Sequence, residues 1–147
     1  MNIQVSRLRE SDAQNGAKVL DQFGKQPDLN HLRQLLASDG HFFVAASISG
    51  AWAGYAHGYE LVRPDHGSML FLYSLDVLPQ YRRKGVGTAL PSFMRTLAET
   101  RDMRELFVFT TRSNEAAVEL YKATGGTIEN GDDLLFVYPT HAANQIA

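Results

Sequence analysis

Arg82-Arg83-Lys84-Gly85-Val86-Gly87-Thr88 is the stretch that decides how this chain is interpreted. It follows an apolar run over 69–78 and precedes a run to about Thr100 in which apolar residues recur at helical spacing. Glycines let the backbone approach a ligand, and the N–H groups at a helix start attract anions. With three cations beside them, these residues predict an anion site for which a pyrophosphate is the natural ligand.

Two familiar phosphate-binding motifs do not fit this stretch. A P-loop requires glycine, lysine and then serine or threonine, whereas Lys84 precedes Gly85 here. The dinucleotide fingerprint requires a third glycine where this chain has Leu90, and it follows a first strand rather than a central one. The structural alternative is a glycine-containing turn with solvated charges. The flanking cations and the following helix favour the anion site.

Composition limits the chain to one small globular domain. Its 147 residues are 44% hydrophobic and 20% charged, so we expect a single domain over 1–147 with a flexible tail over 140–147. The absence of cysteine excludes disulfides, thiolate nucleophiles and iron–sulfur clusters. No apolar run approaches the ~20 residues of a membrane helix, and the N-terminus lacks a signal peptide's apolar segment. A soluble, cytoplasmic protein is therefore expected.

The charge distribution favours a small anionic ligand over nucleic acid or a membrane. The net charge is −2, and because Arg82, Arg83 and Lys84 are consecutive, the rest of the chain is more acidic than the whole. One compact basic spot does not match the spread basic face of a nucleic-acid-binding protein. The five histidines form no pair at metal-ligand spacing on one element, so no metal site is expected.

Periodicity predicts an α/β (α+β) domain whose mixed, mostly antiparallel central sheet carries helices on both faces. Strands are expected at 3–8, 42–48, 51–61, 69–78 and 105–110, and in a final hairpin of 127–129 and 134–138. Helices are expected at about 12–23, 28–36, 85–100 and 113–124, the second capped by Asp28 and the last by Ser113. Pro91 lies beyond the first turn of its helix, which predicts either a kink or a later helix start.

The strand over 69–78 is the expected centre of the sheet. It is apolar on both faces as far as Leu72, which is typical of a strand covered on both sides. Beyond that point one face turns polar, at Ser74 and Asp76. The C-terminal end of this strand is therefore expected to border a cleft.

Two motifs together resemble the GNAT superfamily of N-acetyltransferases. Arg-x-x-Gly-x-Gly over 82–87, after Leu75-Asp76-Val77-Leu78-Pro79-Gln80-Tyr81, is similar to the acetyl-CoA motif of that superfamily. The run SNEAAVELYKATGG over 113–126 is similar to its asparagine-to-tyrosine helix. The order of the elements agrees along nearly the whole chain.

The resemblance implies a role for each of these positions. Backbone amides from Arg83 to Thr88, with Arg82 beside them, would hold the pyrophosphate of acetyl-CoA. Edge groups of Leu75 and Val77 would pair with the pantetheine arm, and the Val77 amide would polarise the thioester carbonyl. Asn114 would contact the cofactor, and Tyr121 would protonate the departing thiolate.

The spacing of the last helix agrees with these roles. Asn114, Ala117 and Tyr121 are three and then four positions apart, so they line one stripe. A phenol with a pKa near ~10 donates to a thiolate only with help from placement and local electrostatics. The residues alone favour a core tyrosine that anchors the helix, whereas the resemblance favours the acid.

A narrower resemblance links the first half to class I aminoglycoside 3-N-acetyltransferases. It rests on Phe23-Gly24, Gln26-Pro27-Asp28, Leu32 and Leu35-Leu36, and continues through Phe42 to Ala46, Leu61, Pro64 and Leu72-Tyr73. Where that group has Tyr-Asp-Leu-Ala-Val, this chain has Tyr73-Ser74-Leu75-Asp76-Val77, with the acidic side chain two positions later. The narrower resemblance therefore leaves the general base unassigned.

The acceptor site needs a group that takes a proton, because an amine attacks a thioester only as the neutral base. Asp76 is the first candidate, and the alternative is a solvent-exposed carboxylate at a strand end. Tyr73 and Ser74 could relay a proton through water, and Glu60 and His57 are weaker candidates. A polycationic acceptor would favour several carboxylates, for which the candidates are Asp28, Glu60, Asp76, Asp132 and Asp133.

The leading hypothesis is an acetyl-CoA-dependent N-acetyltransferase that transfers acetyl directly to a primary amine. The expected amine is the 3-amino group of an aminoglycoside, which would make the protein an antibiotic-resistance enzyme. The second hypothesis keeps the chemistry but uses a protein N-terminus, a lysine, a polyamine or another small amine. The third is a non-catalytic acyl-CoA-binding module. The resemblance also implies a homodimer.

Overall fold

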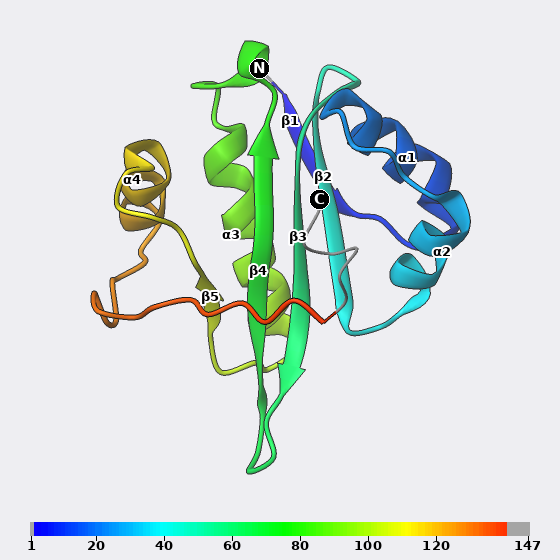
Figure 1. Ribbon diagram of the computed structural model, residues 1–147. Coiled ribbons are helices and arrows are strands. Elements are labelled where there is room, and N and C mark those ends of the chain that lie inside the picture. Colours follow the sequence, from blue (N-terminus) through cyan, green and yellow to red (C-terminus); the bar gives the residue numbers. More distant parts are fainter. Residues whose placement is uncertain (1, 141–147) are drawn as a thin grey trace.

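Five strands form one mixed sheet, in the order β1-β2-β3-β4-β5 (Figure 1). The computed structural model describes residues 2–140. The strands are β1 (Ile3–Arg7), β2 (His41–Ile48), β3 (Ala51–Val62), β4 (Ser68–Val77) and β5 (Leu106–Val108). The first four are antiparallel to their neighbours, and β5 runs parallel to β4. The mixed, mostly antiparallel sheet is confirmed.

Helices cover both faces of this sheet, as predicted. They are α1 (Ala13–Gln22) and α2 (Leu29–Ala37), preceded by the 3-10 turn η1 (Glu10–Asp12), and α3 (Val86–Thr100) and α4 (Glu115–Ala123), preceded by the 3-10 turn η2 (Pro79–Tyr81). Figure 1 shows α3 along β4 and the pair α1 and α2 beside β2. Val44 and Ala46 of β2 belong to the core that contains α3, whereas Phe43 and Ala45 belong to the core that contains α1 and α2. Alternate strand residues thus point to opposite helices.

Close approach between α3 and the sheet requires two glycines of β3. A Cβ atom at Gly54 would lie 3.1 Å from Cγ1 of Val86 and 3.3 Å from Cδ1 of Leu90, both in α3, and 2.7 Å from the carbonyl oxygen of Asp76 in β4. One at Gly58 would lie 2.7 Å from the carbonyl oxygen of Phe71 and 2.8 Å from Cε of Met94. The distances to Val86, Leu90 and Met94 are shorter than van der Waals contact between carbon atoms, so larger residues at these two positions would push α3 away from the sheet.

β4 becomes irregular toward its C-terminal end. Leu72 pairs with Gly58 and Ser74 pairs with His57, so Tyr73 is the extra residue of a β-bulge. β5 pairs with β4 only at 70–72. Among the residues described, no strand pairs with the outer edge of β4 over 73–77. A bulge and an unpaired edge therefore coincide where the sequence predicts a cleft.

Several local predictions can be compared with the helix termini. Asp28 caps α2 as predicted, because its carboxylate accepts a hydrogen bond from the backbone N–H of His31 (3.1 Å). The cap of α4 is Asn114 rather than Ser113, because the Asn114 carboxamide oxygen accepts from the N–H of Ala117 (3.2 Å). α4 ends before the two glycines, as predicted.

In the second half of the chain the prediction of a final hairpin is wrong, and one of the two alternatives given for Pro91 is excluded. α3 begins at Val86 and continues through the buried Pro91, so the alternative of a later helix start is excluded. Residues 127–129 and 134–138 form no hairpin, and the side chains from Leu134 to Tyr138 are 73–90% exposed. Apolar composition alone does not make a strand, which also needs a neighbouring edge and a face to cover. Residues 141–147 of the predicted tail lie outside the described part.

Candidate active site

The turn over 82–88 enters α3 through an unusual backbone conformation. Arg83 and Gly85 have φ angles of 59° and 95°, in the left-handed region that glycine tolerates and other residues seldom adopt. The N–H of Ala89 donates to the carbonyl of Gly85 (2.9 Å). The N–H groups of residues 86–88 belong to the first turn, so they have no carbonyl partner within the helix.

These features fit an anionic ligand such as the diphosphate that the resemblance implies. Arg82, Arg83 and Lys84 are exposed, and the partial positive charge of the α3 N-terminus lies beside them. The side chain of Val86 is fully buried in the core, so this residue has only its backbone N–H to offer a ligand. The turn therefore suits recognition by backbone amides reinforced by surface cations.

The unpaired edge of β4 lies next to this turn, to which Arg82 connects it. Leu75 and Val77 are half-buried on that edge, and Nε of Arg82 donates to the carbonyl of Val77 (3.3 Å). An extended molecule can bind a free strand edge through main-chain hydrogen bonds. The amide groups of a pantetheine arm would fit this edge.

α4 turns one half-buried face toward the sheet. Ala117 and Tyr121 lie on this face, as their spacing predicts. Burial, and after it the negative charge of Asp76, raises the pKa of Tyr121. The carboxamide oxygen of Asn114 is used in the helix cap, which leaves its NH₂ group as the donor for a ligand.

Asp76, Tyr55 and Tyr121 form the chemical centre of the site. Oη of Tyr55 donates to Oδ2 of Asp76 over a long 3.5 Å. Burial, and then the charge of Asp76, raises the pKa of Tyr55, while a hydrogen bond with Ser74 acts in the opposite direction. An exposed carboxylate thus has two tyrosines near it, from β3 and α4, whose hydroxyls stay protonated at neutral pH. The arrangement offers one proton acceptor and two proton donors.

His57, Ser74 and Tyr73 lie next to this centre. His57 is opposite Ser74 in the register of β3 and β4, and its Nε2 is buried without a hydrogen-bond partner. Burial, and then nearby His41, lowers the pKa of His57 to about 4, so the ring is neutral at pH 7. The ring of Tyr73 lies 6.3 Å from that of His57.

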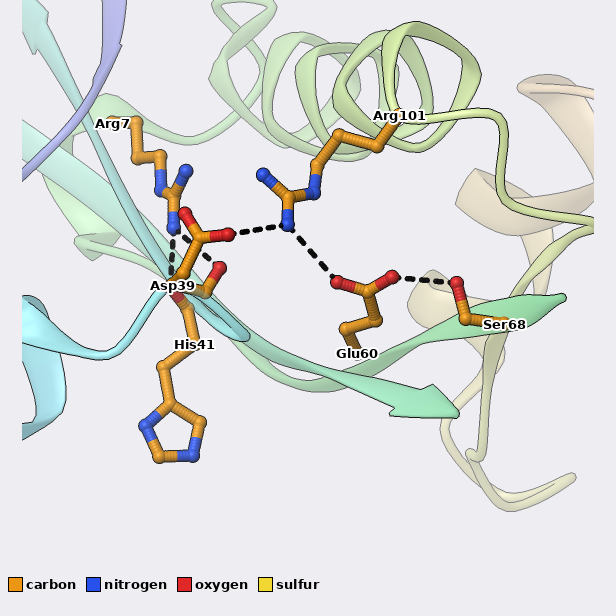
Figure 2. A network of polar contacts seen from close by, with 6 residues as sticks. All are labelled: Arg7, Asp39, His41, Glu60, Ser68 and Arg101. Atoms are coloured by element: carbon orange, nitrogen blue, oxygen red, sulfur yellow. Dashed lines mark hydrogen bonds and ion pairs between the residues drawn. The ribbon is translucent and has the colours of Figure 1, made fainter. Parts of the chain in front are cut away.

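Glu60 lies away from Asp76, on the face of β3 that is turned toward α3. Its carboxylate accepts hydrogen bonds from Nη2 of Arg101 (3.2 Å) and Oγ of Ser68 (2.6 Å), as Figure 2 shows. The same Nη2 donates to Oδ2 of Asp39 (2.8 Å). The structure therefore places Glu60 in a polar network at the end of α3 and does not bring it to the tyrosines.

The other predicted carboxylates form no hydrogen bond or ion pair with Asp76, Tyr55 or Tyr121 among the residues that the structure describes, and they lie in other parts of the fold. Asp28 uses its carboxylate to cap α2, and Asp132 and Asp133 lie in the exposed segment after α4. Of the five carboxylates predicted for a polycationic acceptor, Asp76 is the one whose charge acts on Tyr55 and Tyr121.

The sequence analysis missed Tyr55 and Tyr59 of β3, although it named His57 between them as a weaker candidate base. Alternation over 51–61 puts Tyr55, His57 and Tyr59 on one face, and this pattern is readable from the sequence. That Tyr55 lies opposite Asp76 depends on the register of β3 and β4, which the bulge shifts by one residue. The contact therefore required the structure.

Two further classes of site were searched for in the described part of the chain. Over residues 2–140, no three histidine, aspartate or glutamate side chains are grouped so that they could hold a metal ion. Nor does any helix of this part have the length and apolar character needed to cross a membrane.

Comparison with known protein families and sequences gives a consistent result. The family model described as "Acetyltransferase (GNAT) family" matches residues 6–125. An "N-alpha-acetyltransferase" of Sulfurisphaera tokodaii is 33% identical over 110 residues, which are 66% of this chain and 60% of that protein. The chain therefore matches about three fifths of the length of this relative.

Comparison with solved structures supports the same fold. An aminoglycoside acetyltransferase, HMB0005, from an uncultured soil metagenomic sample has a TM-score of 0.82 and 27% identity, covering 96% of this chain and 100% of that one. A second, meta-AAC0020, also from such a sample and in complex with sisomicin, has a TM-score of 0.85 and 21% identity, covering 95% and 96%. AAC(6')-Iy, bound to a bisubstrate analogue of CoA and acetylneamine, has a TM-score of 0.78 and 19% identity, covering 95% and 99%.

Proposed function

The chain belongs to the acetyltransferase (GNAT) family, whose members use acetyl-CoA, and we propose that its acceptor is a primary amine of an aminoglycoside. The observation that carries the proposal is the hydrogen bond of Tyr55 with Asp76 beside the unpaired edge of β4, and the effect of the Asp76 charge on the pKa of Tyr121 supports it. The similarity to HMB0005 and meta-AAC0020 supports the acceptor class. The 3-amino group stays a prediction, since AAC(6')-Iy carries another position in its name.

Acetyl-CoA supplies an activated acetyl thioester. The residues that would hold its diphosphate are the backbone amides of 83–88 with the cations Arg82, Arg83 and Lys84, and its pantetheine arm would lie along Leu75 and Val77. The NH₂ group of Asn114 and the stripe through Ala117 would contact it from α4. This assignment is supported by the left-handed Gly85 and by the free edge of β4.

Asp76 is the proposed general base for the acceptor amine. Its carboxylate is exposed, so an amine can reach it, and it is oriented by the hydrogen bond from Tyr55. An ammonium group would be attracted to the carboxylate before it loses its proton. Ser74 and Tyr73 belong to the same strand as Asp76, and we retain them as proposed acceptor-side residues of a water-mediated relay.

Tyr121 is the proposed general acid. Its raised pKa keeps a proton on Oη throughout the neutral range, so the group is ready to donate to a leaving sulfur. Asp76 contributes to this raised pKa, so the two groups suit the two opposite proton transfers of one reaction. We therefore propose direct transfer with no covalent enzyme intermediate; the chain has no cysteine that could carry the acetyl group as a thioester.

The second candidate function is acetylation of a protein N-terminus. It is favoured by one observation, the 33% identity to an N-alpha-acetyltransferase over 110 residues. Lysine, polyamine and other small amines are further acceptors of the same chemistry. A homodimer is also proposed, since the exposed apolar side chains of 134–138 offer surface that a second copy could bury; light scattering of the purified protein tests it.

The experiment is release of free thiol from acetyl-CoA with aminoglycosides, a peptide and polyamines, in the wild type and Tyr121→Phe. We expect turnover with an aminoglycoside, and in the variant a kcat reduced by about 10-fold or more while acetyl-CoA binding survives. Tyr138→Phe is the matched control, because Tyr138 is 84% exposed. Turnover with the peptide alone would replace the acceptor class, and an unchanged kcat in Tyr121→Phe would assign that residue to packing. Binding of acetyl-CoA without turnover of any amine would favour the non-catalytic module.

A further inference from the structure

A group of aromatic rings lies on the sheet face opposite α3, the face that also carries Asp76. We call Tyr59, Phe71, Tyr73, Phe107 and Phe109 the aromatic platform. Phe71 is paired in register with Tyr59 on one side and with Phe107 on the other, so three neighbouring strands contribute to it. Tyr73 is 64% exposed and Phe109 is 70% exposed.

The rings of the platform support one another. Phe71 and Phe107 stack in parallel with centroids 4.9 Å apart, and Phe109 meets them edge-on at 5.9 and 6.0 Å. Tyr73 meets Phe71 edge-on at 5.7 Å and Tyr59 at 6.0 Å. These are favourable aromatic geometries, so the platform is a firm surface rather than a set of independent side chains.

Neither of the apolar segments near it covers the platform. The core that contains α1 and α2 reaches β3 at Tyr55 and Trp52 and includes no platform residue. The side chains over 134–138 are themselves 73–90% exposed, so they do not pack on it. A contiguous exposed apolar patch in a folded protein indicates a binding surface.

The platform is continuous with the proposed acceptor site. The ring of His57 lies 4.7 Å from that of Tyr59 and 6.3 Å from that of Tyr73. Two positions along β3 from His57, Tyr55 donates its hydrogen bond to Asp76. A molecule lying on the platform would therefore have Asp76 at its end.

We propose that the aromatic platform seats the ring of the acceptor while Asp76 receives its amine, so the acceptor is an amine carried on a ring. This inference rests on the proposed acetyl transfer. Aromatic faces bind a flat π system or the C–H face of a sugar, which an arylalkylamine and an aminosugar respectively supply. A linear polyamine supplies neither and would need several carboxylates, whereas Glu60 is on the other face of the sheet. Ring shape, more than the number of positive charges, then selects the substrate.

The test compares ring-bearing and linear amines on the purified protein. With kanamycin, tyramine and spermidine as acceptors, Phe109→Ala and Tyr73→Ala should each raise KM for the ring-bearing amine by about 3- to 10-fold, the loss of one aromatic contact. In Phe109→Ala, which lies outside the proposed proton relay, KM for spermidine and kcat should change less than twofold. Tyr73→Phe keeps the ring and should retain the wild-type KM. A larger KM increase for kanamycin than for tyramine would indicate that the platform binds the C–H face of a sugar, and the reverse would indicate that it binds a flat π system.

A direct binding measurement separates this inference from the proposed function. Calorimetric titration without acetyl-CoA should show the same loss of affinity for the ring-bearing amine in Phe109→Ala, and no loss for spermidine. The control Val62→Ala, whose side chain is 80% exposed at the far end of β3, should lose affinity for none of the amines. Equal losses for spermidine and the ring-bearing amines, or no loss for any, would overturn the platform. Wild-type protein that binds acetyl-CoA but acetylates no amine would overturn the proposed function, and the titration would still decide about the platform.

Discussion

The two faces of β4 differ in what covers them, although both are largely apolar. Leu70 and Leu72 point into the core with α3 and are fully buried, whereas the intervening Phe71 is half-buried and the following Tyr73 is mostly exposed. The first face holds the sheet to a helix, and the second leaves rings and Asp76 accessible. Because alternate side chains of β4 point to opposite faces, one face stabilises the fold and the other is accessible to a ligand.

The covered face should show the largest effect on stability. Leu72→Ala removes a fully buried side chain from the core with α3, so we expect the free energy of unfolding to fall by about 2–5 kcal/mol. Chemical denaturation measures it. Val62→Ala, at the exposed end of β3, should stay within about 0.5 kcal/mol of the wild type. Equal costs at the two positions would show that the α3 face is not the one that stabilises the fold.

The sequence could predict the helices and strands of the fold, but not which face of β4 a helix covers. Apolar spacing and helix caps are local, so the strands, the four helices and the cap at Asp28 could be predicted from them. Which apolar face of a strand a helix covers is decided by segments that are distant in the sequence. The apolar run over 69–72 does not indicate that the side with Phe71 has no helix over it. The segment over 134–138 shows the same limit, because it has the composition of a strand but no edge beside it.

His57 allows a test of the uncovered face by pH. Burial lowers its pKa to about 4, so between pH 6.5 and 4 the unfolded chain binds a proton that the folded protein excludes. Stability contributed by neutral His57 is complete above pH 6.5 and is lost as the pH falls toward 4. At pH 4.5 the loss should be roughly 2 kcal/mol greater in the wild type than in His57→Phe, with both compared to pH 7.5.

Denaturation at these two pH values measures the difference, and the comparison of variants cancels the carboxylates that titrate in the same range. His41, Tyr59 and Tyr73 face the same ring, and all three are present in both proteins. If both proteins lost the same stability on acidification, the ring of His57 would be accessible to water. The region around Asp76 would then be more open than the buried Nε2 indicates.

The cofactor side of the candidate site could be predicted from the sequence, whereas the geometry of the acceptor side could not. The glycine turn and the Asn114 to Tyr121 helix are continuous segments, so spacing and resemblance identify them. The acceptor side is assembled across strands, and its geometry depends on a bulge at Tyr73 that no local pattern announces. Glu60 shows the consequence, since it was grouped with Asp76 by charge although the two carboxylates belong to opposite faces of the sheet.

Apart from the controls, Glu60→Gln should have the smallest effect on stability of these variants, and it tests most directly whether the two faces of the sheet have separate roles. Glu60 accepts hydrogen bonds from Arg101 and Ser68, and its side chain is 17% exposed, so losing the charge should cost about 1 kcal/mol of unfolding free energy. The exposed ion pair of Glu99 with Arg95 provides the control, and Glu99→Gln should cost less than about 0.5 kcal/mol. The KM for the acceptor amine should be unchanged in both variants, because neither carboxylate lies on the face that carries Asp76. A raised acceptor KM in Glu60→Gln, with stability preserved, would mean that the acceptor reaches around the sheet and that the two faces of β4 do not divide stability from substrate binding.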